Sequence, residues 1–209
     1  MFSNEKELVE KLVLDLQERY NTQYIVRELR SGKNIADVVY TTEIDRQNIV
    51  FDDYFNAYYY FNSIYRKKKI LIDDMGISDT GACKKFCHFL QQLEKLGYVK
   101  IDGNYVTSIK GVDAVTKNFV AVEAKLSDWK AGLEQAKRYK QYANEVYVAI
   151  SAEYVNKIDK NQFKEANIGV MSVSKDKLKI PIRAKKEKVQ KKDIQYFVTD
   201  RFLKQLKMA

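Results

Sequence analysis

The stretch NFVAVEAKL, residues 118–126, combines the pattern of a buried strand with two charged side chains. Successive side chains of a strand point to opposite faces of a sheet, so Glu123 and Lys125 share one face with Phe119 and Ala121. A carboxylate and an ammonium group on an apolar strand are costly unless they pair, bind a metal or take part in chemistry. The stretch therefore predicts a strand whose charged pair needs an explanation.

The sequence after this strand alternates between helical and strand patterns. This alternation indicates an α/β fold with at least partly parallel strand pairing. The lysine-rich stretch 185–192 is expected to be solvated, and Pro181, the only proline of the chain, favours an edge position for its strand. Helices are expected over residues 128–143, 153–166 and 193–207, and strands over residues 145–151, 168–174 and 177–183.

The first fifty residues predict a helix followed by a β-hairpin. Apolar side chains recur at helical spacing over residues 4–20, with Ser3 as the expected N-cap. Strand patterns at residues 24–29 and 35–41 flank a turn that contains glycine. Asp37 lies in the second strand, among β-branched and aromatic residues, so this carboxylate also needs a reason.

Residues 51–111 differ in character and predict an inserted domain. Helical patterns at residues 52–69, 70–75 and 79–96 precede a hairpin with a glycine-bearing turn. This order closely resembles a winged helix-turn-helix, inserted into an α/β core formed by residues 1–50 and 112–209. The apolar face of its last helix is expected to comprise Cys83, Phe86, Cys87, Leu90 and Leu93.

Composition narrows the classes of function. The chain has 37 basic and 28 acidic residues, and its net charge of +9 favours a polyanionic partner, although a lysine-rich surface alone explains it equally well. A single histidine, two cysteines and no Walker-type loop argue against a Ser-His-Asp triad, a multi-histidine zinc site and nucleotide chemistry. No apolar run reaches the roughly 18 residues of a membrane span, and the amino terminus lacks signal-peptide features, so a cytoplasmic protein is expected.

Asp37, the Glu123-Ala124-Lys125 strand and a following helix with Gln135 and Tyr139 resemble, in this order, the PD-(D/E)xK nuclease superfamily. The Gln-x-x-x-Tyr spacing is similar to that of its RecB-type branch. The resemblance implies a restriction-endonuclease-like mixed sheet flanked by helices and a metal-dependent deoxyribonuclease activity. Ala36 stands where the superfamily has a proline, which leaves the carboxylate in place but removes one identifying residue.

The resemblance also implies roles for the site residues. Asp37, Glu123 and the main-chain oxygen of Ala124 would bind Mg²⁺, with Mn²⁺ as an alternative, because these are hard oxygen ligands. Lys125 would orient the attacking water or stabilise developing negative charge, and Gln135 would support the site. A glutamate of the first helix would join the metal ligands. Glu5 fits the inward face best, and Glu7 and Glu10 are alternatives.

DNA is the partner that both the nuclease-like core and the inserted domain imply. A homodimer would supply the two cuts that a duplex requires. Three alternatives stay open: a purely structural ion pair, a DNA-binding regulator without activity, and a winged helix that binds protein instead of DNA. The residues expected to contact DNA are Thr80, Lys84, Lys85, His88, Gln91, Lys100, Lys110 and Tyr139. For Tyr139, packing within the protein is an equally open alternative.

Overall fold

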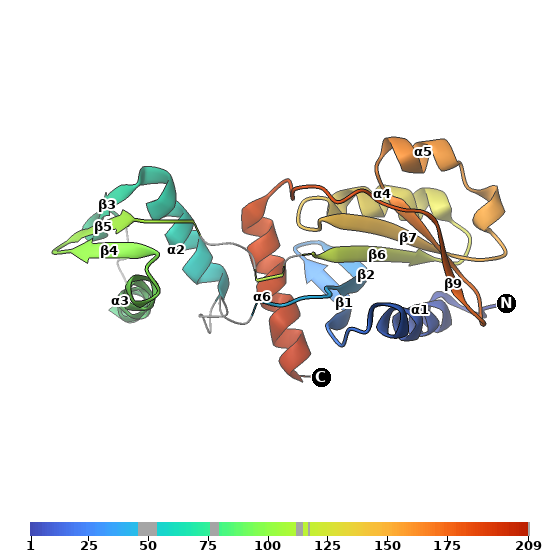
Figure 1. Cartoon of the computed structure of the whole chain (residues 1–209), viewed down its shortest axis with the longest axis horizontal. Coiled ribbons are helices and arrows are strands. Elements are labelled where there is room, and N and C mark those ends of the chain that lie inside the picture. Colours follow the sequence, from blue (N-terminus) through green and yellow to red (C-terminus); the bar gives the residue numbers. More distant parts are fainter. Residues whose placement is uncertain (46–53, 76–79, 112–114, 117, 209) are drawn as a thin grey trace. The chain divides into compact units, whose positions relative to one another are not determined.

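The computed structural model describes residues 1–45, 54–75, 80–111, 115–116 and 118–208, which form two compact units (Figure 1). The larger unit comprises Met1–Asp45 and Thr116–Ala209, and Arg46–Val115 forms the smaller one. The sequence analysis placed the inserted segment at residues 51–111, so each expected boundary lies a few residues from that of Arg46–Val115. The chain is thus a mixed α/β protein whose main unit is assembled from two separate segments.

The main unit is built on a six-stranded mixed sheet with the order β1-β2-β6-β7-β8-β9. The three strands β6, β7 and β8 run parallel, and the remaining pairs are antiparallel. Pro181 lies in the edge strand β9, where a missing N–H donor costs no ladder bond on the open side. The strands are β1 Ile25–Ser31, β2 Asn34–Tyr40, β6 Val120–Lys125, β7 Glu145–Ser151, β8 Gly169–Val173 and β9 Leu178–Ile182.

Helices cover both faces of this sheet (Figure 1). Helix α1 packs on the face that carries Val122 and Ala124, whereas α4, α5 and α6 pack on the face of Phe119 and Ala121. The side chains from Phe119 to Ala124 therefore alternate between the two faces, as the sequence predicts. Within the described ranges, no helix combines the length and hydrophobicity that a bilayer span requires. The helices are α1 Glu5–Tyr20, α4 Trp129–Tyr139, α5 Lys160–Glu165 and α6 Lys192–Met208, with a 3₁₀ turn at Val155–Lys157.

Two local expectations for the main unit were wrong. Asn4, rather than Ser3, caps α1, since its side chain accepts a hydrogen bond from the Glu7 N–H. The single helix expected over residues 153–166 is interrupted at Ile158, and Asp159 begins α5 by accepting from the Asn161 N–H. In both places a short polar side chain competes successfully with the helical pattern.

The smaller unit joins two helices to a three-stranded antiparallel sheet of order β3-β5-β4. The expected helix over residues 70–75 is instead β3 and a 3₁₀ turn. Lys68 adopts a left-handed conformation (φ 62°) that ends α2, and Ile70 then pairs with Val106. Cys87 is exposed, whereas Phe89 is buried in its place on the apolar face. The elements are α2 Tyr54–Lys67, β3 Lys69–Leu71, the 3₁₀ turn Ile72–Met75, α3 Thr80–Lys95, β4 Val99–Asp102 and β5 Tyr105–Ser108.

Candidate active site

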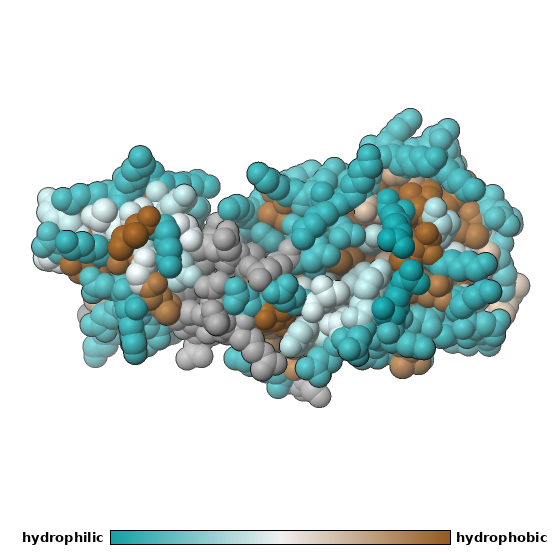
Figure 2. Space-filling model, in the orientation of Figure 1, coloured by the Kyte–Doolittle hydropathy of each residue, from teal (hydrophilic) through white to brown (hydrophobic). Residues whose placement is uncertain are grey.

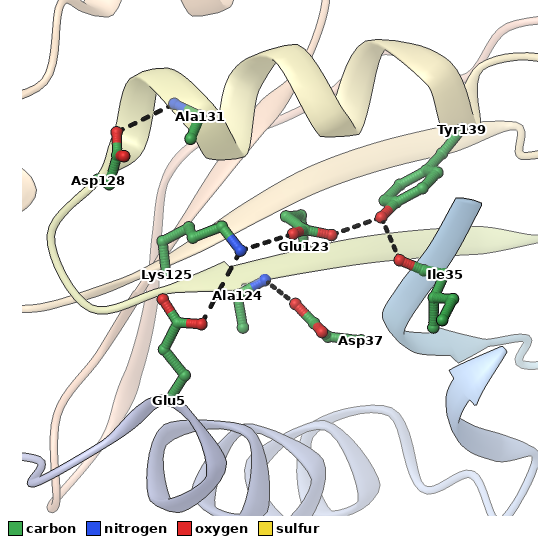
Figure 3. A network of polar contacts seen from close by, with 9 residues as sticks. All are labelled: Glu5, Ile35, Asp37, Glu123, Ala124, Lys125, Asp128, Ala131 and Tyr139. Atoms are coloured by element: carbon green, nitrogen blue, oxygen red, sulfur yellow. Dashed lines mark hydrogen bonds and ion pairs between the residues drawn. The ribbon is translucent and has the colours of Figure 1, made fainter. Parts of the chain in front are cut away.

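Asp37 and Glu123 lie side by side on neighbouring strands. The antiparallel register pairs Val38 of β2 with Val122 of β6, so Asp37, which precedes Val38, is a neighbour of Glu123, which follows Val122. The Ala124 N–H donates a hydrogen bond to Asp37 Oδ2 over 2.7 Å, which fixes the carboxylate against β6 (Figure 3). Residues 87 positions apart in the chain thus contribute to one polar cluster.

Lys125 extends this cluster toward α1. Its Nζ lies 2.9 Å from Glu123 Oε1 and 3.9 Å from Glu5 Oε2 (Figure 3). Of the three glutamates that the sequence left open, Glu5 is therefore the one that reaches the cluster. Glu7 instead binds Ser3 and Lys175, and these bonds lower the pKa of its carboxyl group to about 2.

Tyr139 closes the cluster from the side of α4. Its hydroxyl lies 2.5 Å from Glu123 Oε2 and 2.6 Å from the main-chain oxygen of Ile35 (Figure 3). The side chain is only 1% exposed. It therefore holds Glu123 from inside the core, whereas the sequence had placed it in contact with DNA. The Ile35 oxygen has no sequence signal, because any residue supplies a main-chain carbonyl.

Gln135 lies one helical turn before Tyr139 on α4, which puts both side chains on the same side of the helix. Its side chain is half-buried, and it makes no hydrogen bond with any described residue. The proposed supporting role of Gln135 therefore stays a prediction. Tyr139, one turn later, is the residue of this pair that contacts the cluster.

The charges of the cluster affect one another. Burial, followed by repulsion from Glu123, raises the pKa of Asp37 to about 6. Burial acts to lower the pKa of Lys125, but its ion pair with Glu123 outweighs this effect, so the pKa is raised. Lys125 is consequently an ammonium group at neutral pH, suited to stabilising negative charge and unsuited to accepting a proton.

The donors fit a hard divalent cation by their chemistry. Asp37, Glu123 and the Ala124 carbonyl are oxygen ligands of the kind that Mg²⁺ prefers. Burial raises the pKa of Asp37 most, and repulsion from Glu123 adds to it; a cation would relieve this repulsion. Both oxygens of Glu123 are engaged, however, one by Lys125 and one by Tyr139. Across the described residues, no three His, Cys, Asp or Glu side chains are grouped closely enough to hold a metal.

The residues expected to contact DNA in the smaller unit are mostly on its surface. Phe86 and Leu90 face the interior of this unit. Lys110 is also exposed and places its Nζ 4.5 Å from the centre of the Tyr98 ring. The side chain of Thr80 lies outside the described residues. The expected DNA contacts of α3 and β4 that are exposed are Lys84, Lys85, His88, Gln91 and Lys100.

The contact between Tyr139 and Glu123 leads to a stability prediction. Replacing Tyr139 with phenylalanine removes the hydroxyl and leaves a buried carboxylate oxygen without its partner, so unfolding free energy should fall by about 1–3 kcal/mol. Urea unfolding measures this. Tyr142→Phe is the matched control, because the Tyr142 hydroxyl is buried in the same core but forms no hydrogen bond with a carboxylate among the described residues. The unfolding free energy of Tyr142→Phe should stay within about 0.5 kcal/mol of the wild type. Equal losses of unfolding free energy in both variants would contradict the prediction.

Comparisons with known proteins add little to this geometry. No protein-family model matches the chain, and no curated protein matches it. A solved structure from Silicibacter pomeroyi, the SPO1766 protein of unknown function, is similar at 9% identity and a TM-score of 0.48. The similarity covers 97% of this chain and 86% of that one. No activity follows from it.

Proposed function

We propose that the protein is a Mg²⁺-dependent deoxyribonuclease of the restriction-endonuclease-like kind, with a winged-helix insertion that engages DNA. The observation that carries this proposal is the meeting of Asp37, Glu123 and Lys125 at one place on adjacent strands. A purely structural ion pair accounts for Glu123 and Lys125 but leaves the half-buried Asp37 unexplained. A cation site accounts for all three.

Each residue of the cluster has a separate role in the proposed hydrolysis. Asp37, Glu123 and the Ala124 oxygen would hold Mg²⁺, which supplies an acidified water and charge neutralisation when bound. Lys125, as an ammonium group, stabilises the negative charge that develops on the phosphodiester. Tyr139 keeps the Glu123 carboxylate oriented, and Glu5 balances the charge of Lys125 from the start of α1.

A cleavage assay tests this proposal. Purified protein is incubated with supercoiled plasmid, linear duplex, single-stranded DNA and RNA, with Mg²⁺, with Mn²⁺ and with EDTA. Cleavage of DNA that requires the divalent cation is the expected result. Absence of cleavage on every substrate, or cleavage that persists in EDTA, would overturn the proposed activity.

A second candidate function is DNA binding without catalysis. It is favoured because both carboxylate oxygens of Glu123 already have protein partners, Lys125 and Tyr139. This function predicts DNA affinity that does not depend on a divalent cation. It also predicts that substitution of Asp37 leaves binding unchanged.

Both functions require α3 to contact DNA, which a double charge reversal tests. Lys84→Glu with Lys85→Glu should weaken duplex binding about tenfold or more near 0.1 M salt, because two phosphate contacts become repulsive. Fluorescence anisotropy with EDTA present measures this. Lys160→Glu with Lys164→Glu, on the exposed face of α5, makes the same change in net charge. If both double variants lose the same affinity, α3 is not the contact surface.

A further inference from the structure

The connection between β9 and α6 carries most of the net charge of the chain. We define the lysine strap as residues 183–192, which run from the end of β9 to the first residue of α6. Six of its ten residues are cations and one is a carboxylate, so it contributes +5 to a total of +9. Its cations are Arg183, Lys185, Lys186, Lys188, Lys191 and Lys192.

The strap is attached to the main unit through its backbone, although it forms no strand of the sheet. Lys185 exchanges two hydrogen bonds with the Asn167 side chain, at 2.8 and 2.9 Å. The Glu187 N–H donates to the main-chain carbonyl of Asn144, and the Asn144 side-chain amide donates to the main-chain carbonyl of Glu187. Further along, the Lys191 N–H donates to the Gln141 carbonyl over 3.0 Å. These bonds hold the strap in place and leave its six cationic side chains exposed.

The charged groups of the six strap cations form no ion pair with the residues that the structure describes. The single carboxylate, Glu187, is paired with Lys140 at 3.0 Å, so it does not neutralise them. Figure 2 shows hydrophilic side chains over the region where Figure 1 shows the strap crossing the sheet. A fixed row of unpaired positive charge is thus presented to the surroundings.

We infer that the lysine strap is a DNA-backbone contact surface separate from both the candidate active site and α3. An extended chain rises about 3.3 Å per residue, close to the roughly 3.4 Å of helix axis for each phosphate of one strand of duplex DNA. The strap can therefore face several consecutive phosphates. An anionic bilayer fits less well, because membrane-surface segments carry bulky apolar anchors and the apolar residues here are Ala184 and Val189, both half-buried.

The position of the strap relative to the active site follows from the sheet. Its anchors Asn144 and Asn167 precede β7 and β8, so the strap crosses the amino-terminal ends of the parallel strands. Asn144 also bonds to Phe119, about 13 Å along β6 from Glu123. Resting on the proposed function, this spacing means that the strap holds the duplex several base pairs from the bond that is cut.

A salt titration of DNA binding tests the strap. Lys186→Gln, Lys188→Gln and Lys191→Gln are combined in an Asp37→Ala background that cannot cleave, and duplex affinity is measured between 50 and 200 mM NaCl. The slope of log K against log salt should become shallower by about 2–3, equally for two unrelated sequences, because up to three phosphate contacts are lost. A matched control replaces Lys157, Lys160 and Lys207 with glutamine, all exposed and without ion pairs among the described residues.

The outcomes separate this inference from the proposed activity. An unchanged slope, or an equal change in the control, overturns the strap. The inference is also overturned if the triple glutamine variant binds DNA as before but no longer binds phosphatidylserine vesicles, because the strap would then be a membrane-contact surface. Lys→Arg at the same three positions should restore the slope, since charge is kept. If the slope responds as expected but wild-type protein never cuts DNA, the strap stands and the proposed nuclease activity fails.

Discussion

Replacing Asp37 with asparagine should reduce Mg²⁺-dependent cleavage by about a thousandfold or more while stabilising the folded protein above pH 6. Asparagine keeps an oxygen that accepts from the Ala124 N–H but removes the charge that binds the cation. Loss of one anionic ligand removes several kcal/mol of transition-state stabilisation, which corresponds to this factor. Single-turnover cleavage at saturating DNA measures the first effect.

The gain in stability has a defined pH dependence. The pKa of Asp37 is about 6 in the folded protein, above its ordinary value of 3.8, so the folded state binds the proton more tightly. Wild-type stability therefore falls as pH rises from about 4 to 6 and stays lowered above that. The variant should be more stable by about 1–2 kcal/mol at pH 7.5, after allowing for partial exposure, and show no such gain at pH 4.

Asp15→Asn is the control for this prediction, because Asp15 is a buried carboxylate of the same unit that pairs with Lys11, outside the candidate site. Its cleavage rate should match the wild type. Adding Mg²⁺ should stabilise the wild type and not the Asp37 variant, since only a bound ligand shifts unfolding. Full cleavage by Asp37→Asn would remove the central ligand from the proposed site.

Lys125→Ala should lower the cleavage rate by about 100- to 1000-fold with little change in DNA affinity. Lys125 is an ammonium group beside Glu123, and its charge is expected to act on the transition state rather than on bound DNA. The change should therefore appear in the rate at saturating DNA and leave the dissociation constant nearly unchanged. Because a buried carboxylate loses its partner, unfolding free energy should also fall.

Lys137→Ala is the control that distinguishes the effects of Lys125→Ala on cleavage and stability from the general effect of losing an ion pair. Lys137 pairs with Glu134 at 2.5 Å on the exposed side of α4, where such a pair contributes about 0–0.5 kcal/mol. Both cleavage and stability should stay close to wild type. A Lys125 variant that cuts at the wild-type rate, or that fails only because it no longer binds DNA, would contradict the assigned role.

Much of the fold could be predicted from periodicity. The alternation of Val122 and Glu123 between two faces holds because both faces of β6 are covered. Ile70 was misassigned to a helix because a short apolar run has no clear period, and its strand depends on a partner at Val106 far along the chain. Local capping by Asp159 likewise outweighed the longer helical pattern.

The site could be predicted only as far as its residue types allow. Order and spacing brought Asp37 and Glu123 into one hypothesis, but whether they meet depends on strand register, which one sequence does not specify. Tyr139 was placed on the DNA surface because a helical position alone does not reveal which face packs on the sheet. Its burial against Glu123 became evident only from the packing of α4.

The bridge between Ile44 and Thr116 affects how the chain reaches its native state. These residues join the two segments of the main unit across about seventy intervening positions. Closing a disordered loop of that length costs about 2 kcal/mol more than closing one of five residues. If Arg46–Val115 folds first, most of this entropy has already been lost. Early structure in the insertion should then speed formation of the main sheet, and a destabilised insertion should slow its refolding.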